Sequence, residues 1–237
     1  MRCSLVPIHD ENPVSITPWI TRVLILANII FFIVELGLDP EQLEDFFYTW
    51  AFVPCQLTNS CPVALPGSPF PEWITLITSQ FLHGGFGHII GNMLYLAIFG
   101  NNVEDCLGHF KFLIFYIVCG MLAALTQGFF APDSAIPTLG ASGAIAGVLG
   151  AYIIRFPRAK ITLLPFLLIP IPVRLSAIFF LGFWFVTQLM NGVASLNVDA
   201  VMGSEPGGVA YWAHAGGFVF GAILGPILGL FSGPKPR

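Results

Sequence analysis

A single serine lies among small residues in the stretch Gly140–Gly150, at the start of an apolar segment that predicts a helix. At a helix N-terminus, the Ser142 hydroxyl can cap free backbone N–H groups. Alternatively, it can be a nucleophile, and those N–H groups then stabilise the oxyanion that forms when it attacks a carbonyl. The spacing of Gly143, Gly147 and Gly150 is also that of a packing motif in membrane helices, in which serine is simply a small contact residue. The local pattern leaves chemistry and packing both open.

Four further polar side chains lie in or beside apolar segments and could act together with this serine. They are His83, His88, Asn92 and His214. An imidazole within hydrogen-bond reach of a serine hydroxyl can activate it, because free serine is a weak nucleophile at neutral pH. The histidines could instead bind a metal, but two imidazoles five residues apart without a carboxylate nearby form a poor site. We therefore expect neither a metal nor a cofactor.

The composition indicates an integral membrane protein. Of its 237 residues, 56% are hydrophobic and 9% are charged, whereas soluble domains carry roughly 25% charged residues. No basic patch supports nucleic-acid binding, and no short apolar core with a cleavage site indicates a signal peptide near the start. The cysteines form no zinc framework; Cys55 and Cys61 could form a disulfide or remain two thiols.

Six apolar segments predict an all-α, polytopic fold, a bundle of six transmembrane helices. Most of them approach the roughly 20 residues that a helix needs to cross a bilayer. The segments are Trp19–Leu38, Phe81–Gly100, Phe112–Phe130, Ser142–Ile154, Leu175–Val193 and Tyr211–Phe231. We expect a membrane domain over residues 19–232, between a short cytoplasmic N-terminal segment (residues 1–18) and a cytoplasmic tail (residues 233–237).

The charges predict how the chain is oriented. With six crossings, all nine Lys and Arg residues fall on one side of the membrane, and the loops on the other side contain none. The positive-inside rule then places both termini in the cytoplasm, and we expect a plasma membrane. The long outer loop Asp39–Gln80 is expected partly in the interface, and the proline-broken stretch Thr162–Pro172 is expected to be a loop at the cytoplasmic face.

Three separate spans are expected to bring the serine, histidine and asparagine candidates to one depth in the membrane. Ser142 lies thirteen residues before Arg155, roughly 20 Å along a helix, which places its hydroxyl roughly 10 Å below the outer surface. The second and sixth spans also start outside, so the same outer half contains His83, His88, Asn92 and His214. His88 shares a helical face with Asn92.

Glycine spacing predicts a close contact between the fourth and sixth spans. Gly217, Gly221 and Gly225 form a stripe that can lie against the glycines of the fourth span, which brings Ser142 and His214 to the same rim. No Asp or Glu is expected at this depth. A Ser–His dyad is therefore favoured over a triad.

Polar residues near the outer ends of two other spans receive no catalytic role. Glu35, in the first span, is expected to be solvated at the interface. Gln188 and Asn191, in the fifth span, are expected to face a loop or to bond between helices.

Three linked motifs resemble those of the rhomboid intramembrane serine proteases, in the order that this family has. They are Gly140-Ala-Ser-Gly143, Phe81-Leu-His-Gly-Gly-Phe-Gly-His-Ile-Ile-Gly-Asn-Met-Leu94, and Ala213-His-Ala-Gly-Gly217 with Gly221. The resemblance extends from about Trp19 to Phe231 and implies a prokaryotic-type protein of six spans.

This resemblance implies a role for each candidate residue. Ser142 would be the nucleophile and His214 the general base. Asn92, His88 and the backbone N–H of Ser142 would stabilise the oxyanion, whereas His83 matches a histidine that looks structural.

The resemblance also implies which segments form a lateral gate and a cap loop, and it leaves the orientation of His214 open. The fifth span would match the lateral gate, and Val193–Ala210 would match the cap loop over the active site. Ala146 stands where many relatives have a bulky aromatic residue against the histidine, so what orients His214 is open. The Trp-Arg pair that some relatives carry in the first loop is absent.

Two function classes remain. The first is an intramembrane protease that cleaves single-span substrates near their outer end through an acyl-enzyme, after unwinding the substrate helix to free its carbonyl. The second is a non-catalytic rhomboid-like protein that binds client helices, although such proteins usually lack the serine or the histidine. A transporter would have charged residues at mid-membrane or an inverted repeat. The protease is favoured, with single-span proteins and the lipid bilayer as partners.

Overall fold

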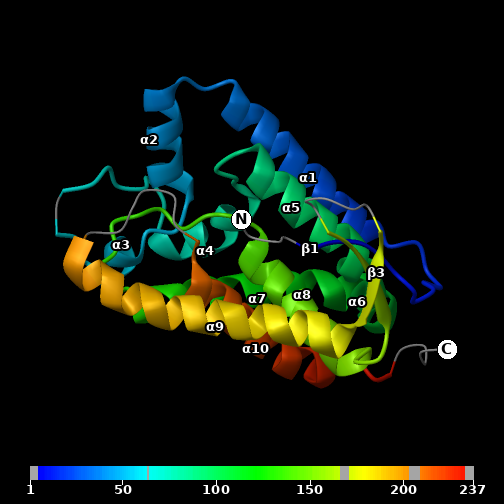
Figure 1. Cartoon of the computed structure of the whole chain (residues 1–237). Helices are drawn as coiled ribbons and strands as arrows, with labels where there is room; N and C mark the ends of the chain where they lie inside the picture. Colours follow the sequence, from blue (N-terminus) through cyan, green and yellow to red (C-terminus); the bar gives the residue numbers. More distant parts are fainter. Residues whose placement is uncertain (1–4, 63, 166–170, 203–208, 233–237) are drawn as a thin grey trace.

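The computed structural model describes residues 5–62, 64–165, 171–202 and 209–232, and this part of the chain is mostly helical (Figure 1). Four of its helices are long and apolar enough to cross a membrane. They are α1 (Trp19–Leu36), α7 (His109–Phe130), α9 (Ala177–Met202) and α10 (Tyr211–Leu228). The predicted helical membrane fold is confirmed, whereas the number of crossings stays a prediction.

The other two predicted spans are not single long helices: one is divided into segments and the other is short. The second consists of consecutive helical segments, α5 (Phe86–Tyr95), the π-helical turn η3 (Leu96–Gly100) and α6 (Asn101–Leu107), so it starts and ends later than predicted. The fourth is α8 (Ser142–Arg155), which is apolar but short.

Helix α8 lies at the centre of the bundle. Every residue from Gly143 to Ile153 is buried, and the helix contacts α5, α6, α7, α9 and α10. Because protein interiors are close-packed, side chains at the first turn of α8 are held more firmly than those of a peripheral helix.

Short helices fill the long loop between α1 and α5. They are α2 (Pro40–Trp50), α3 (Pro54–Thr58), η1 (Glu72–Ile74), α4 (Thr75–Thr78) and η2 (Ser79–Phe81). Asp39 and Gln42 form a capping box at the start of α2, which satisfies backbone N–H groups that the helix leaves free. Cys55 and Cys61, left open by the sequence, form a disulfide in this loop.

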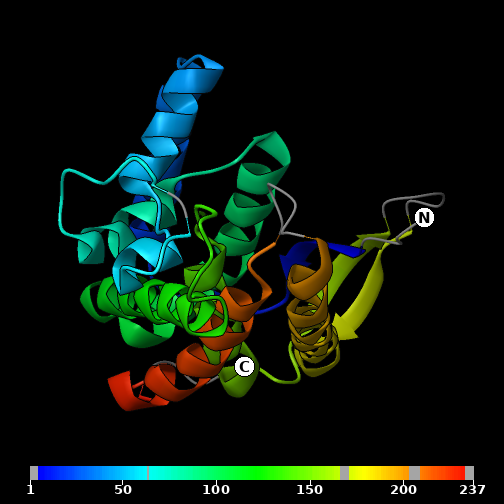
Figure 2. The ribbon, with the colours of Figure 1, turned by 90° about the vertical axis from the view of Figure 1, so that its left-hand side faces the viewer.

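The prediction of a loop over Thr162–Pro172 was wrong for its first part, which is a strand. A small antiparallel sheet contains β1 (Leu5–Asp10), β2 (Lys160–Pro165) and β3 (Val173–Ser176), in the order β1-β2-β3. In β2, Ile161 and Leu163 are fully buried, the alternation that a strand needs. Figure 2 shows the sheet at one side of the bundle beside α9, and β1 contacts α5 and η3.

A buried carboxylate joins this sheet to the helices. Asp10 is 4% exposed and accepts hydrogen bonds from the Tyr152 hydroxyl of α8 at 2.7 Å and from the Asn102 amide of α6 at 2.9 Å. Burial raises the pKa of Asp10, an effect that the hydrogen bonds partly oppose. The N-terminal strand is thereby fixed to the helix that carries Ser142.

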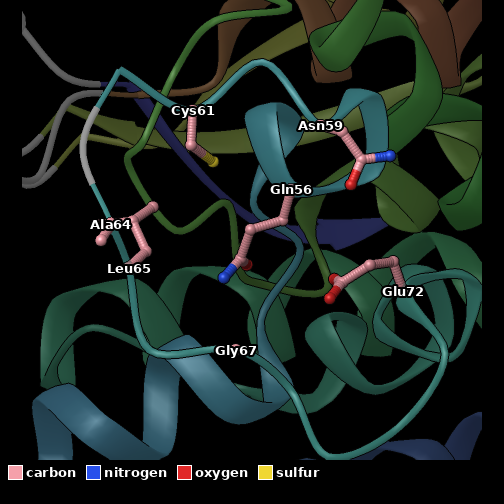
Figure 3. A pocket seen from close by; sticks show the side chains of 7 residues that line it. All are labelled: Gln56, Asn59, Cys61, Ala64, Leu65, Gly67 and Glu72. Atoms are coloured by element: carbon pink, nitrogen blue, oxygen red, sulfur yellow. The ribbon is translucent and has the colours of Figure 1, made fainter.

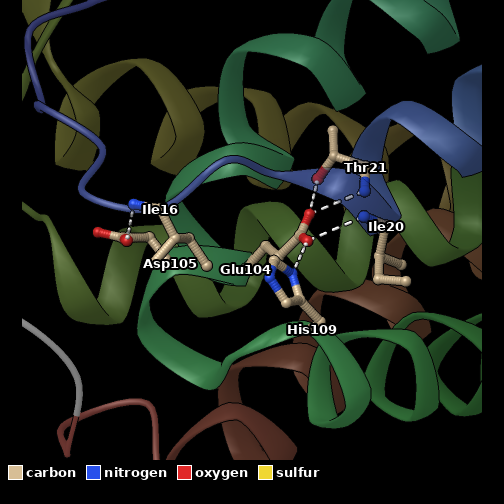
Figure 4. Close-up of polar contacts among 6 residues, drawn as sticks. All are labelled: Ile16, Ile20, Thr21, Glu104, Asp105 and His109. Carbon is tan, nitrogen blue, oxygen red and sulfur yellow. Dashed lines mark hydrogen bonds and ion pairs between the residues drawn. The ribbon is translucent and has the colours of Figure 1, made fainter.

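A second buried carboxylate holds the start of α1 (Figure 4). Glu104, fully buried in α6, accepts hydrogen bonds from the backbone N–H groups of Ile20 and Thr21 at 2.9 and 2.8 Å. It also accepts from the Thr21 hydroxyl and from Nδ1 of His109. A carboxylate at this place satisfies free first-turn N–H groups and interacts favourably with the helix dipole.

Two further expectations differ from the structure. Glu35 is 3% exposed rather than solvated, because its carboxylate accepts the backbone N–H of His83 at 3.1 Å. Helix α9 continues to Met202, so the first part of the predicted cap loop Val193–Ala210 is helical. The remainder of that loop lies largely outside the described residues, as do the predicted tail and residues 1–4.

Candidate active site

Ser142 is the first residue of α8 and does not cap it. The N-cap position belongs to Ala141, and within the described residues no side chain bonds to the first-turn N–H groups of this helix. Capping, one of the uses that the sequence allowed for this serine, is therefore not seen among the described residues, and the roles of nucleophile and of packing residue both stay predictions. The half-buried hydroxyl is directed to another helix instead.

The partner of this hydroxyl is His214, in the first turn of α10. Oγ of Ser142 and Nε2 of His214 are 2.8 Å apart, the separation of a good hydrogen bond. The backbone N–H of the preceding Ala213 donates to the side-chain oxygen of Gln127 on α7 at 3.3 Å. Three helices thus meet at the start of α10.

Contact between glycine backbones sets the distance between α8 and α10. A Cβ atom on Gly217 would overlap the carbonyl oxygen of Gly143, and one on Gly221 would overlap that of Gly147. The predicted packing of the two glycine stripes is confirmed. Since backbone cannot move aside as a side chain can, glycine at these places allows Ser142 to reach His214.

His88 and Asn92 of α5 converge on the turn that leads into Ser142. A Cβ atom on Gly140 would lie 2.7 Å from Nε2 of His88 and 3.7 Å from Nδ2 of Asn92. Gly140 also has φ +120°, a backbone conformation that other residues avoid. The turn therefore needs glycine, and both side chains present nitrogen atoms to it.

His83 contacts Asn92 from the loop before α5. Its Nε2 lies 3.0 Å from Nδ2 of Asn92, and its ring meets the ring of His88 at a centroid distance of 5.0 Å. The side chain is 1% exposed. Since the carboxylate of Glu35 accepts its backbone N–H, His83 links α1 to Asn92, and a structural role for His83 stays a prediction.

One residue of the site was missed from the sequence. Nδ1 of His214 lies 2.8 Å from Oε1 of Gln188 on α9, which the sequence analysis left to face a loop or bond between helices. The ring of Trp184, one turn earlier on α9, lies 5.8 Å from the His214 ring. The signal available in the sequence was an amide side chain on a mostly apolar helix, and its depth could not be calculated because the end of α9 was misplaced.

The described residues contain no candidate metal site, and they form a surface pocket away from the candidate active-site residues. Among the described residues, no cluster of three His, Cys, Asp or Glu side chains has the form of a metal site. A surface depression in the loop between α1 and α5 is lined by residues around the disulfide, including Gln56, Cys61 and Glu72 (Figure 3). Burial raises the pKa of the Glu72 carboxyl. None of the candidate site residues lines this depression.

Fold and site together define a multi-pass helical membrane protein with a serine–histidine pair at the first turns of two packed helices. A family model described as the Rhomboid domain matches residues 71–231. The chain therefore belongs to the rhomboid family, which is known for intramembrane serine proteases.

Several curated proteins are similar to this chain. RHOMBOID-like protein 12, mitochondrial, of Arabidopsis thaliana is 33% identical over 198 residues, which cover 76% of this chain and 58% of that protein. Rhomboid protein 1, mitochondrial, of Saccharomyces cerevisiae is 34% identical over 64% of this chain and 41% of that protein. Rhomboid protease GluP of Bacillus subtilis is 40% identical over 34% of this chain and 15% of that protein. The chain spans about half the length of the first two.

Proposed function

We propose that this protein is an intramembrane serine endopeptidase in which Ser142 is the nucleophile and His214 is the general base. The observation that supports this most directly is the 2.8 Å separation of Ser142 Oγ from His214 Nε2. A serine that serves only to pack helices needs no imidazole at its hydroxyl. A nucleophilic serine does, because it must lose its proton as it attacks.

The reaction follows from these positions. Ser142 Oγ attacks the substrate carbonyl carbon while its proton passes to Nε2 of His214, and the carbonyl oxygen becomes an oxyanion. When the intermediate collapses, the C–N bond breaks and His214 gives the proton to the leaving amine, which leaves an acyl-enzyme ester. Water then attacks the ester, His214 accepts its proton and returns it to Ser142, and a carboxylic acid is released.

Three groups are proposed to stabilise the oxyanion. They are the side chains of Asn92 and His88 and the backbone N–H of Ser142. Both side chains lie against the turn at Gly140, and the N–H belongs to a helix start without a side-chain cap. Donors fixed before the reaction stabilise developing charge without reorganising.

We propose single-span membrane proteins as substrates, cleaved near their outer end. A transmembrane helix buries its carbonyl groups in internal hydrogen bonds, so the substrate must unwind locally before Ser142 can attack. We expect helix-weak residues near the cleaved bond and a small residue at it.

We also propose that residues 19–232 form the membrane domain, with cytoplasmic segments at 1–18 and 233–237, in a plasma membrane. The nine basic residues on one side support this orientation. The Cys55–Cys61 disulfide supports it too, because it lies in the loop assigned to the outside, where an oxidising environment preserves it. Cysteine labelling from each side of sealed vesicles tests the orientation.

Cleavage of a single-span reporter by purified protein in liposomes tests the function. We expect the parent to cleave the reporter near its outer end, and Ser142→Ala and His214→Ala both to be inactive while still folded. A folded parent that leaves a panel of reporters intact would favour the client-binding class. Cleavage that survives Ser142→Ala would refute the site assignment.

A further inference from the structure

The imidazole of His214 has partners on two different helices. Its Nε2 lies at Ser142 of α8, and its Nδ1 lies 2.8 Å from Oε1 of Gln188 on α9. An amide oxygen can only accept, so Nδ1 carries the proton and donates it. In a neutral imidazole this leaves Nε2 free of a proton, which is the form that can take the proton of Ser142.

Two weak contacts favour this orientation of the Gln188 amide. Its Nε2 lies 3.5 Å from the carbonyl oxygen of Trp184 and 3.5 Å from Oγ1 of Thr187. The Thr187 hydroxyl donates its own proton to the same carbonyl at 2.6 Å, so its oxygen is available as an acceptor. A reversed amide would present N–H to Nδ1 and would favour the tautomer with the proton on Nε2, which cannot accept from serine.

Gln188 and His214 lie within a largely aromatic contact between α9 and α10. Gln188 is 8% exposed, and it shares a helix face with Trp184, whose ring is beside His214, and with Gly192, which packs against Trp212. An amide buried in such a contact is costly unless it is hydrogen-bonded. A leucine would fill this place well, which indicates that the amide is there for its hydrogen bond.

We propose that Gln188 is a positioning residue for catalysis: it holds His214 in the tautomer and orientation that can accept the proton of Ser142. This proposal rests on the proposed function of the Ser142–His214 pair.

Three variants test this role in the cleavage assay. Gln188→Leu keeps the volume and removes the acceptor, Gln188→Glu keeps an acceptor and adds charge, and Asn191→Ala is the control at an exposed position of the same helix. We expect Gln188→Leu to lower kcat roughly 10- to 100-fold, the effect of losing one orienting hydrogen bond, with KM within about twofold. Gln188→Glu should retain activity, with the acidic limb of its pH profile moved to higher pH. Asn191→Ala should match the parent.

The pH comparison needs one control for a neighbouring group. Besides Ser142, Trp184 and Gln188, the described side chains that act on His214 include His88 of α5, which influences it electrostatically. The profiles are therefore compared with His88 unchanged. A Gln188→Leu variant with kcat within about threefold of the parent would overturn the proposal, and so would a Gln188→Glu profile that coincides with that of the parent.

A second measurement does not depend on activity. Nitrogen-15 NMR of histidine-labelled protein, assigned by comparison with His214→Ala, reports which ring nitrogen carries the proton. We expect protonated Nδ1 in the parent and a mixture of tautomers in Gln188→Leu; protonated Nε2 in the parent would overturn the proposal. If the parent cleaves nothing but shows the expected tautomer, the proposed function fails while the placement of His214 by Gln188 stands.

Discussion

Replacing Gly221 by alanine tests whether the backbone contact of α8 and α10 sets the distance between Ser142 and His214. The added Cβ would overlap backbone atoms of Gly147. Backbone inside a helix cannot rearrange locally as a side chain can. The two helices must therefore separate. Inserting a methyl group into a packed contact costs roughly 1–3 kcal/mol of stability. A displacement of about 1 Å at reacting groups costs on the order of 100-fold in rate.

Gly182→Ala is the matched control for this change. Gly182 is also inside a helix, α9, but a Cβ atom there would have no neighbour within 4 Å. We expect this variant to be more stable by roughly 0.5–1 kcal/mol, because alanine favours the helix, and to keep the parent kcat. Turnover in liposomes and thermal unfolding in detergent are measured for both variants. A Gly221→Ala protein with the parent kcat would show that the glycine contact does not set the geometry of the site.

Three further changes test separate parts of the structure. Asn92→Ala should lower kcat roughly 100- to 1,000-fold, as loss of an oxyanion donor does; a kcat within tenfold of the parent in folded protein would remove Asn92 from that role. Glu104→Ala should lower the free energy of unfolding by roughly 2–4 kcal/mol, because it leaves N–H groups of α1 unpaired, and an unchanged unfolding transition in detergent would contradict this. Burial raises the pKa of Asp10, so its contribution to stability is complete at low pH and is lost as the pH rises through the folded-state pKa. The stability of Asp10→Asn relative to the parent should accordingly increase with pH in unfolding measurements, and a difference independent of pH would contradict it.

The residues that act on one another across helices were predictable from the sequence where depth and spacing could be calculated. Counting from Arg155 placed Ser142 near the start of a span, and the orientation of the sixth span placed His214 near the same level. The glycine stripe of α10 predicted the close contact that joins them. These arguments need only the helix rise, the side on which a span begins and the spacing of small residues around a helix.

Other contacts could not be predicted from helix depth and residue spacing. The pairing of β1 with β2 joins residues as far apart as Leu5 and Pro165, and the prolines after β2 favoured a loop. The bond between His214 and Gln188 depends on the rotation of α9 and on where that helix ends. The burial of Glu35 was not predicted for another reason. Its partner is a backbone N–H in the loop before α5, and no side-chain pattern indicates such a partner.

The most direct test of the catalytic pair is to react the purified protein with a small fluorophosphonate and locate the adduct by mass spectrometry. Only an activated serine attacks such a reagent at an appreciable rate, so the test needs no knowledge of the substrate. We expect a single adduct on the peptide that contains Ser142, and none in His214→Ala. An adduct on another residue, or one on Ser142 that forms equally well without His214, would contradict the account.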